Sequence, residues 1–422
     1  MNTQTIRGPR SLSACLVLAL ALLSSVAQAA IDGLTGTVFN LTAEAGHITT
    51  PDGGSLYIWG YAANGAGAQY PGPTLILNQG DTVQINLQNQ LPEPTSIVFP
   101  GQVVAASGGS AGLVTREAET NGGTVSYTFT ASQPGTYLYN SGTKPDLQVE
   151  MGLFGAIIIR PPVSTQAYNH ADTTFDVEFL FLLSEMDPVI HDLVEQGRVA
   201  EVDTTTFFPV YWFINGRCGP DTLSDANVSW LPSQPYNCAP MMNPGQKLLM
   251  RLIGAGRDPH PFHFHGNNAT IVARDGRMLE SSPGVSGPDL AESDFTITTY
   301  PGGTVDAIFT WTGAKLGWDI YGHTSTNDMM MPNEYEPDHG KPFPVVMPTQ
   351  QELTYGEHFG GGPFLGSPGY LRPGTYNVNP DGAYMYMWHS HAEKEIVNDD
   401  IFPGGMMTML MINSSTNMPM GP

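Results

Sequence analysis

Two short histidine motifs are the part of this sequence best suited to chemistry. The first, residues 258–266, contains His260, His263 and His265, which are three of the 11 histidines in the chain. The second, residues 384–391, ends in the triplet His-Ser-His. Neutral imidazole is a good ligand for copper, zinc and iron. The two motifs therefore indicate a metal site.

The alternation of residue types predicts that both motifs are β-strands. Successive side chains of a strand point to opposite faces. His263 and His265 would then share one face while the phenylalanines beside them turn to the core, and His389 and His391 would share a face of the second strand. If the strands are neighbours, the four imidazoles converge on one metal. Single histidines on strands are more often core or surface residues, but two His-x-His pairs in one domain favour the metal site.

Composition limits the fold and the partners. The chain has 422 residues with a formal charge of −23, is 41% hydrophobic and 13% charged, and contains 48 glycines and 35 prolines. So much Gly and Pro favours turn-rich β structure. The negative charge argues against nucleic acid and anionic membranes as partners. A small molecule or a metal ion is the expected partner.

An export signal is expected at residues 1–29. Arg7 and Arg10 precede the apolar run 14–23, and the small residues Ala27-Gln28-Ala29 follow it. This pattern predicts cleavage near Ala29 and a periplasmic or secreted protein. The apolar run is too short to span a membrane.

Alternating apolar runs predict an all-β protein with two sandwich domains. Residues 82–87 and 124–129 alternate in a first domain over 30–162, and the run 177–182 opens a second domain over 173–413. One helix is expected over Asp187–Gln196, with Ser184 near its start. The second domain is long for one sandwich, so insertions are expected.

The largest insertion is expected at 323–382, and a flexible tail at 414–422. The insertion is rich in Gly, Pro and Met, and His323 and His339 flank Met329–Met331. A loop that captures copper is one interpretation of it, but an insertion without this role is favoured. The methionines between 406 and 411 are interpreted as core.

Two cysteines, Cys218 and Cys238, remain once the export signal is removed. In an oxidising compartment an even pair favours a disulfide. A thiolate metal ligand is the alternative.

The order of several short motifs resembles the multicopper oxidases, which are built from cupredoxin domains. The resemblance spans nearly the whole chain and implies two cupredoxin-like Greek-key domains and copper as cofactor. The layout is similar to that of two-domain laccase-like and nitrite-reductase-like proteins, so it also implies a homotrimer. The matching segments are Pro71–Leu75, Gly80–Val83, Thr95–Ile97, Gly135–Tyr139, Gly152–Ala156, Ile214–Arg217, His260–Gly266 and His389–His391.

The chain departs from the family pattern at the expected copper ligands. The family has His-x-His pairs where this chain has Val98–Pro100 and Asn140–Gly142. It has the cysteine of the blue copper site where this chain has Ser390, and a further histidine where it has Glu395. A blue site needs a thiolate with two imidazoles, so His260 is left as a lone histidine of that site, and it is retained as a fifth candidate metal ligand.

Half of the histidine ligands that the resemblance implies for the family's copper cluster are present in this chain. The resemblance implies a non-blue copper set held by His263, His265, His389 and His391. Two functions follow from it: a redox enzyme with fewer copper ions, or a non-catalytic copper-binding or assembly protein. No catalytic residue is singled out beyond these ligands. Two nearby acids, Glu393 and Glu395, are either further ligands or imidazole partners, or ordinary solvated acids.

Overall fold

The computed structural model describes residues 31–243, 245–311, 345–346, 378–379 and 384–413. The export signal, the tail and most of the insertion expected at 323–382 lie outside the described residues. Within the described parts, no helix is long and apolar enough to cross a lipid bilayer.

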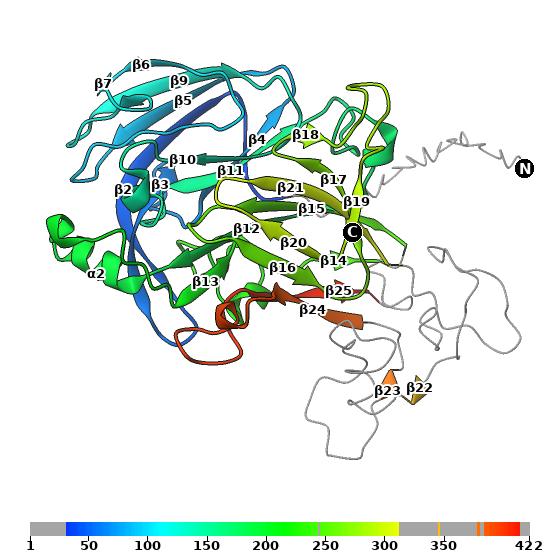
Figure 1. Ribbon diagram of the computed structural model, residues 1–422. Coiled ribbons are helices and arrows are strands. Elements are labelled where there is room, and N and C mark those ends of the chain that lie inside the picture. Colours follow the sequence, from blue (N-terminus) through cyan, green and yellow to red (C-terminus); the bar gives the residue numbers. More distant parts are fainter. Residues whose placement is uncertain (1–30, 244, 312–344, 347–377, 380–383, 414–422) are drawn as a thin grey trace, which may run out of the picture.

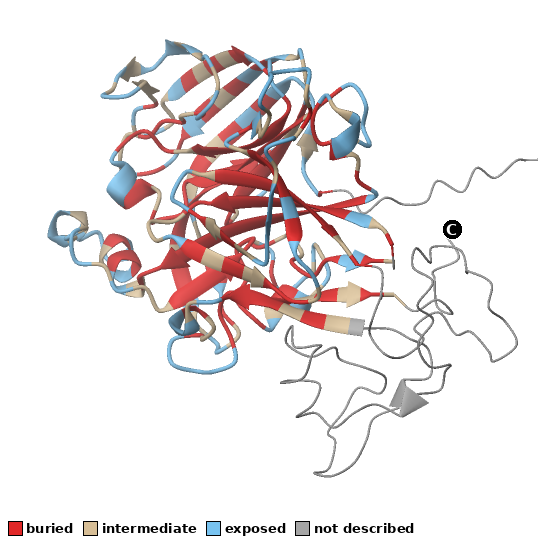
Figure 2. Cartoon of the chain, turned by 45° about the vertical axis from the view of Figure 1, so that its right-hand side comes forward, coloured by how far each residue is buried: buried red, intermediate tan, exposed pale blue. Residues whose placement is uncertain are grey.

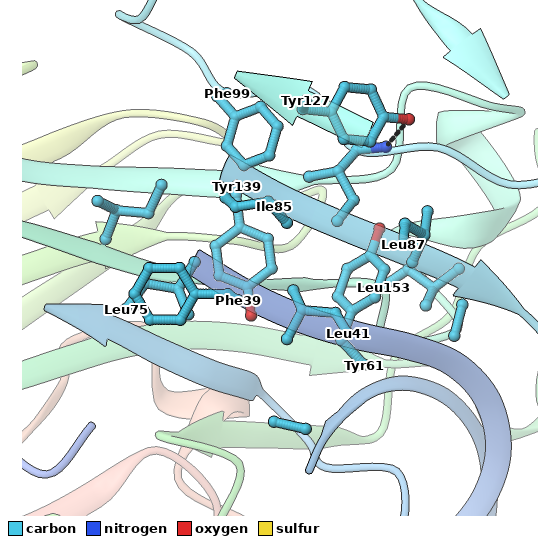
Figure 3. Close-up of a cluster of buried hydrophobic side chains, with 14 of the residues drawn as sticks. Phe39, Leu41, Tyr61, Leu75, Ile85, Leu87, Phe99, Tyr127, Tyr139 and Leu153 are labelled. Carbon is cyan, nitrogen blue, oxygen red and sulfur yellow. Dashed lines mark hydrogen bonds between the residues drawn. The ribbon is translucent and has the colours of Figure 1, made fainter. Parts of the chain in front are cut away.

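The first half of the chain forms two sheets that pack on each other. β5 buries Val83, Ile85 and Leu87 on alternate positions, as its sequence predicts. These side chains meet aromatic rings such as Phe99 and Tyr139 in the core shown in Figure 3. One sheet has the order β1 (Leu34–Thr35), β4 (Gly72–Asn78), β11 (Phe154–Arg160), β10 (Gly135–Asn140), and the other β3 (Ser55–Ala63), β2 (Val38–Thr49), β5 (Thr82–Asn89), β9 (Thr124–Thr130), β6 (Ala105–Gly108), with a small hairpin of β7 (Ser110–Ala111) and β8 (Arg116–Glu117) beside them.

The second half forms a seven-stranded and a five-stranded sheet (green to red in Figure 1). One has the order β13 (Tyr211–Ile214), β12 (Val177–Met186), β15 (Lys247–Gly254), β21 (Thr304–Thr310), β17 (Ala269–Arg274), β18 (Arg277–Met278), and β19 (Glu292–Asp294) pairs with β17. The other has the order β14 (Met241–Met242), β25 (Met407–Ile412), β24 (Tyr384–Ser390), β16 (His260–Phe264), β20 (Thr296–Thr299). A further pair joins β22 (Val345–Val346) to β23 (Val378–Asn379). The mostly antiparallel sheets agree with the all-β prediction.

The predicted helix is present as α2 (Pro188–Glu195), but its start differs from the expectation. Asp187 caps the helix by accepting a hydrogen bond from the amide of Val189. Ser184 instead lies in the buried strand β12, where its hydroxyl is 3.0 Å from that of Tyr70. The described residues also include α1 (Pro145–Gln148), a single turn that the sequence did not suggest.

The two halves of the molecule share a buried interface. A hydrophobic cluster contains Leu138 and Ile158 from the first half and Leu182 and Phe213 from the second. Figure 2 shows buried residues running through the centre of the molecule without a break between the two halves. The halves therefore pack through a common core.

Charged side chains are buried at the same interface. Arg251 on β15 binds Glu178 on β12 at 2.9 Å and lies 3.6 Å from Asp306 on β21. The Asp306 carboxylate also accepts hydrogen bonds from Thr136 at 2.5 Å and from Tyr168 at 2.6 Å. These bonds join β10 of the first half to three strands of the second, so they fix how the halves are oriented.

Candidate metal centre

Two neighbouring strands bring the predicted ligands together. β16 and β24 are antiparallel, and His263 lies directly opposite His389 in their register. Phe262 and Phe264 are buried on the other face of β16. The alternation expected from the sequence is therefore confirmed, and His265 follows directly after the end of β16.

Three histidines form a compact group. The ligand nitrogens of His263, His265 and His389 all lie within 4.8 Å of one another. The Nε2 atoms of His265 and His389 are only 3.3 Å apart. That spacing matches two ligands of one metal ion, since a nitrogen–metal bond is about 2 Å long.

The fourth predicted ligand, His391, lies at the edge of this group. Its ring centroid is 4.8 Å from that of His263 and 5.9 Å from that of His389. Its side chain is exposed, whereas His265 and His389 are buried. The structure thus brings three of the four imidazoles into one tight group and places the fourth at its solvent side.

Hydrogen bonds orient two of the rings. Nδ1 of His389 donates to the carbonyl of Ser390 at 2.7 Å, which leaves its Nε2 with a lone pair. Nδ1 of His263 is 2.8 Å from the hydroxyl of Thr296 on β20. Such partners on the far ring nitrogen fix the tautomer and direction of metal-binding histidines.

The electrostatics keep these rings neutral at pH 7. Burial, together with the neighbouring imidazoles, lowers the pKa of His263 to about 4 and that of His265 to about 3. Burial is also the main cause that lowers the pKa of His389. A metal ion therefore does not compete with protons for these nitrogens at neutral pH.

His260 lies outside this group, and its ring contacts carboxylates instead of other imidazoles. Its Nε2 is 2.7 Å from Glu185 Oε2, and its Nδ1 is 3.0 Å from Glu395 Oε2. The hydroxyl of Ser390 donates to the same oxygen of Glu395 at 2.6 Å. We call Glu185, His260, Glu395 and Ser390 the carboxylate–histidine cluster. All four side chains are buried.

Two carboxylates hold His260 as a cation. Burial on its own would lower the pKa of His260, but the hydrogen bonds and charges of Glu185 and Glu395 raise it to about 9. Glu185 is itself held by the backbone amides of Arg257 and Asp258. A Cβ atom at position 256 would overlap the Glu185 carboxylate, so only glycine allows this close approach.

Three members of the cluster, His260, Ser390 and Glu395, occupy the positions that the resemblance assigns to a blue copper site. Glu395 faces His260, as expected for a residue in place of a ligand histidine, and its burial excludes the solvated-acid interpretation. Glu393 is exposed. Sequence reasoning missed Glu185, although one signal was present: Glu178 and Glu185 are the two acids in the otherwise mostly apolar run of β12.

The first-half segments without histidine pair with each other. Val98 and Asn140 form a β-bridge, with amide-to-carbonyl distances of 2.8 and 3.2 Å in the two directions. The hydroxyl of Ser141 donates to Gln148 at 2.6 Å. These positions are thus used for backbone pairing and hydrogen bonds within the first half.

The expectation of a disulfide is wrong in this structure. Both Cys218 and Cys238 are free and buried. Cys218 belongs to the core shared by the two halves, and Cys238 to the core of the second half. Burial raises the pKa of both thiols, that of Cys238 to about 12, which also argues against a thiolate metal ligand.

The donor set fits copper. All the grouped ligands are imidazoles that are neutral at pH 7, and imidazole suits copper, zinc and iron. His389 presents Nε2 because its Nδ1 is committed to a carbonyl. The group lacks a thiolate among the described residues, so the arrangement fits a non-blue site.

Comparisons with known proteins show the family. Models described as multicopper oxidase match residues 47–164 and 224–335, together more than half of the chain. Copper resistance protein A of Escherichia coli is 29% identical over 238 residues, which is 50% of this chain and 38% of that protein. The iron transport multicopper oxidase fetC of Epichloe festucae is 29% identical over 220 residues, 50% of this chain and 31% of that protein.

Solved structures show a similar fold. The blue copper oxidase of Nitrosomonas europaea is similar with a TM-score of 0.56 at 19% identity, covering 88% of this chain and 85% of that one. The multicopper oxidase mgLAC is similar with a TM-score of 0.55 at 18% identity, with 89% and 85% covered. The chain spans less than half the length of the two curated relatives. It belongs to the multicopper oxidase superfamily.

Proposed function

We propose that the protein is an exported copper-binding redox protein that holds fewer copper ions than the family pattern implies and has no blue copper site. His263, His265 and His389 hold the metal, and His391 completes the shell from its solvent side. The observation that carries this proposal is the 3.3 Å separation of the Nε2 atoms of His265 and His389. Copper bound there would supply one-electron redox chemistry.

The surrounding residues orient and shield the centre. Thr296 and the Ser390 carbonyl direct the rings of His263 and His389. The indole of Trp388 donates to the carbonyl of His265 at 3.0 Å and so ties β24 to the end of β16. His391 is exposed, so a small molecule or a metal ion would approach the centre from its side.

The substrate, location and assembly are part of the same proposal. The names of two relatives concern copper resistance and iron transport, which supports a metal ion or a small reductant as substrate. The pattern of residues 1–29 supports a periplasmic or secreted location, and the two-domain layout supports a homotrimer. Size-exclusion chromatography with light scattering tests the assembly.

Copper loading tests the metal centre directly. The metal-free protein is titrated with Cu(II), bound copper per chain is counted, and the electron paramagnetic resonance (EPR) spectrum is recorded. We expect nitrogen-coordinated, non-blue Cu(II). His389→Ala should weaken binding by at least about tenfold, since even partners of ligands are worth roughly that much. His47→Ala, which alters an exposed histidine on β2, is the control.

A non-catalytic copper-binding or assembly protein is the second candidate. The pairing of Val98 with Asn140, where the family has ligands, favours it. Oxygen consumption by the copper-loaded protein with a phenol or with Fe(II) distinguishes the two. Turnover supports the redox enzyme, and tight copper binding without turnover supports the second candidate. Failure to bind copper would contradict both.

A further inference from the structure

A cleft of about 1090 Å³ lies where the two halves meet. Tyr137 on β10 lines it from the first half, and the β17–β18 hairpin and β20 line it from the second. β20 is the edge strand of its sheet. The volume is close to the upper end for small-molecule sites.

The β17–β18 hairpin carries two arginines into this cleft. Asp275 and Gly276 form its tight turn with positive φ angles of 51° and 69°. Gly276 packs directly on the Tyr137 ring, which leaves no space for a Cβ atom there. The position of the hairpin relative to the first half is therefore well defined.

Arg274 and Arg277 lie directly opposite each other in the register of this hairpin. Like charges in such cross-strand pairs are unfavourable. Glu292 offsets Arg274 with an ion pair of 3.0 Å. Arg277 is exposed and forms no ion pair or hydrogen bond with the part of the chain that the structure describes. An anion in the cleft would relieve this repulsion.

The acidic side chains of the cleft do not serve as partners for Arg277. Asp275 accepts a hydrogen bond from the backbone amide of Thr304 at 2.9 Å. Asp294 accepts one from the amide of Phe295 at 2.8 Å. Both carboxylates are held by the backbone, so one guanidinium remains available to a ligand.

The rest of the lining suits a ring. Tyr300 is 63% exposed and lines the cleft together with the side of β20, whereas Tyr137 is buried beneath Gly276 and forms only part of the wall. Aromatic rings gain stability by stacking or edge contacts with other rings. A guanidinium and a carboxylate pair through two parallel hydrogen bonds.

We propose that this cleft binds a small aromatic carboxylate, with Arg277 on the carboxylate and Tyr300 on the ring. The site is separate from the copper proposal, since none of its contacts needs a metal. It adjoins the histidine group through Thr296, which lines the cleft and contacts His263 at 2.8 Å. A ligand seated against β20 would thus lie one residue from a copper ligand.

Calorimetric titration of the metal-free protein with 4-hydroxybenzoate tests this proposal. We expect saturable binding that Arg277→Gln weakens roughly tenfold or more, since a charge-assisted bidentate pair is lost. Lys247→Gln is the matched control, because Lys247 is an exposed cation on β15 and does not line the cleft. Thermal unfolding checks that both variants are folded.

Neutral phenol has the ring without the carboxylate, and inorganic phosphate is an anion without the ring, so the two probes test the parts of the ligand separately. Weaker binding of both than of 4-hydroxybenzoate supports the proposal. No saturable binding of 4-hydroxybenzoate, equal loss in the two variants, or phosphate binding as tight as that of the aromatic acid would overturn it. Because no copper is present, these outcomes do not depend on the function of the metal centre.

Discussion

Replacing His260 with glutamine tests the carboxylate–histidine cluster most directly. His260 is buried between Glu185 and Glu395, and its pKa is raised from 6.5 to about 9. A group whose pKa is raised in the folded state stabilises that state fully below its unfolded pKa, and this stabilisation is lost as the pH rises through the folded value. The wild-type protein should therefore lose stability between about pH 6.5 and pH 9.

The size of the effect follows from the shift. One pKa unit corresponds to about 1.4 kcal/mol, so a change from 6.5 to about 9 contributes about 3 kcal/mol to the free energy of unfolding. His260→Gln keeps a hydrogen-bonding side chain but no charge. Its free energy of unfolding should lie about 3 kcal/mol below that of the wild type at pH 6 and approach it near pH 10.

Urea unfolding of the metal-free proteins, followed by tryptophan fluorescence, measures this difference. The other groups near His260 include Ser390 and Asp258, and Asp258 lies 3.7 Å from Lys394. They are present in both proteins, so only the difference between wild type and variant is interpreted. His47→Gln, at an exposed histidine, is the control. Parallel stability curves for wild type and His260→Gln from pH 6 to 10 would refute a protonated His260.

Three further predictions concern Ser390, Arg251 and the two buried cysteines. Ser390→Cys should gain visible absorption with copper but no laccase-type oxidation of phenols, because the first half has no histidines at the family positions; oxygen uptake by this variant would contradict that. Arg251→Met leaves Glu178 without its buried partner and should lower the free energy of unfolding by about 3–5 kcal/mol, which urea unfolding measures; an unchanged midpoint would show that Arg160 is sufficient for Glu178. Thiol titration of the denatured, unreduced mature protein should find both buried cysteines, and a count of zero would restore the disulfide.

Local patterns predicted the strands and the faces of the histidines well. The alternation in residues 258–266 and 384–391 depends only on the period of a strand, and β16 and β24 follow it. That the two strands are neighbours was a condition of the metal-site prediction, and the structure meets it through the pairing of His263 with His389. The resemblance also placed Glu395 beside His260.

Contacts between distant segments could not be predicted in this way. Glu185 and His260 are 75 residues apart and meet because of how β12 and β16 pack in the second half. The disulfide prediction rested on compartment and on an even count of cysteines. Neither says in which core a cysteine is placed, and Cys218 and Cys238 belong to different ones.

The shared core gives a reason why the chain retains its first half. That half has no histidine at the positions where the resemblance implies ligands, 98–100 and 140–142, so the proposed metal site alone does not require it. However, Leu138 and Ile158 pack against Leu182 and Phe213 of the second half, and Thr136 satisfies the buried Asp306. Deleting the first half would expose apolar surface and remove one of the two hydroxyl donors of the buried Asp306 carboxylate. The first half is thus a scaffold on which the fold of the second half depends.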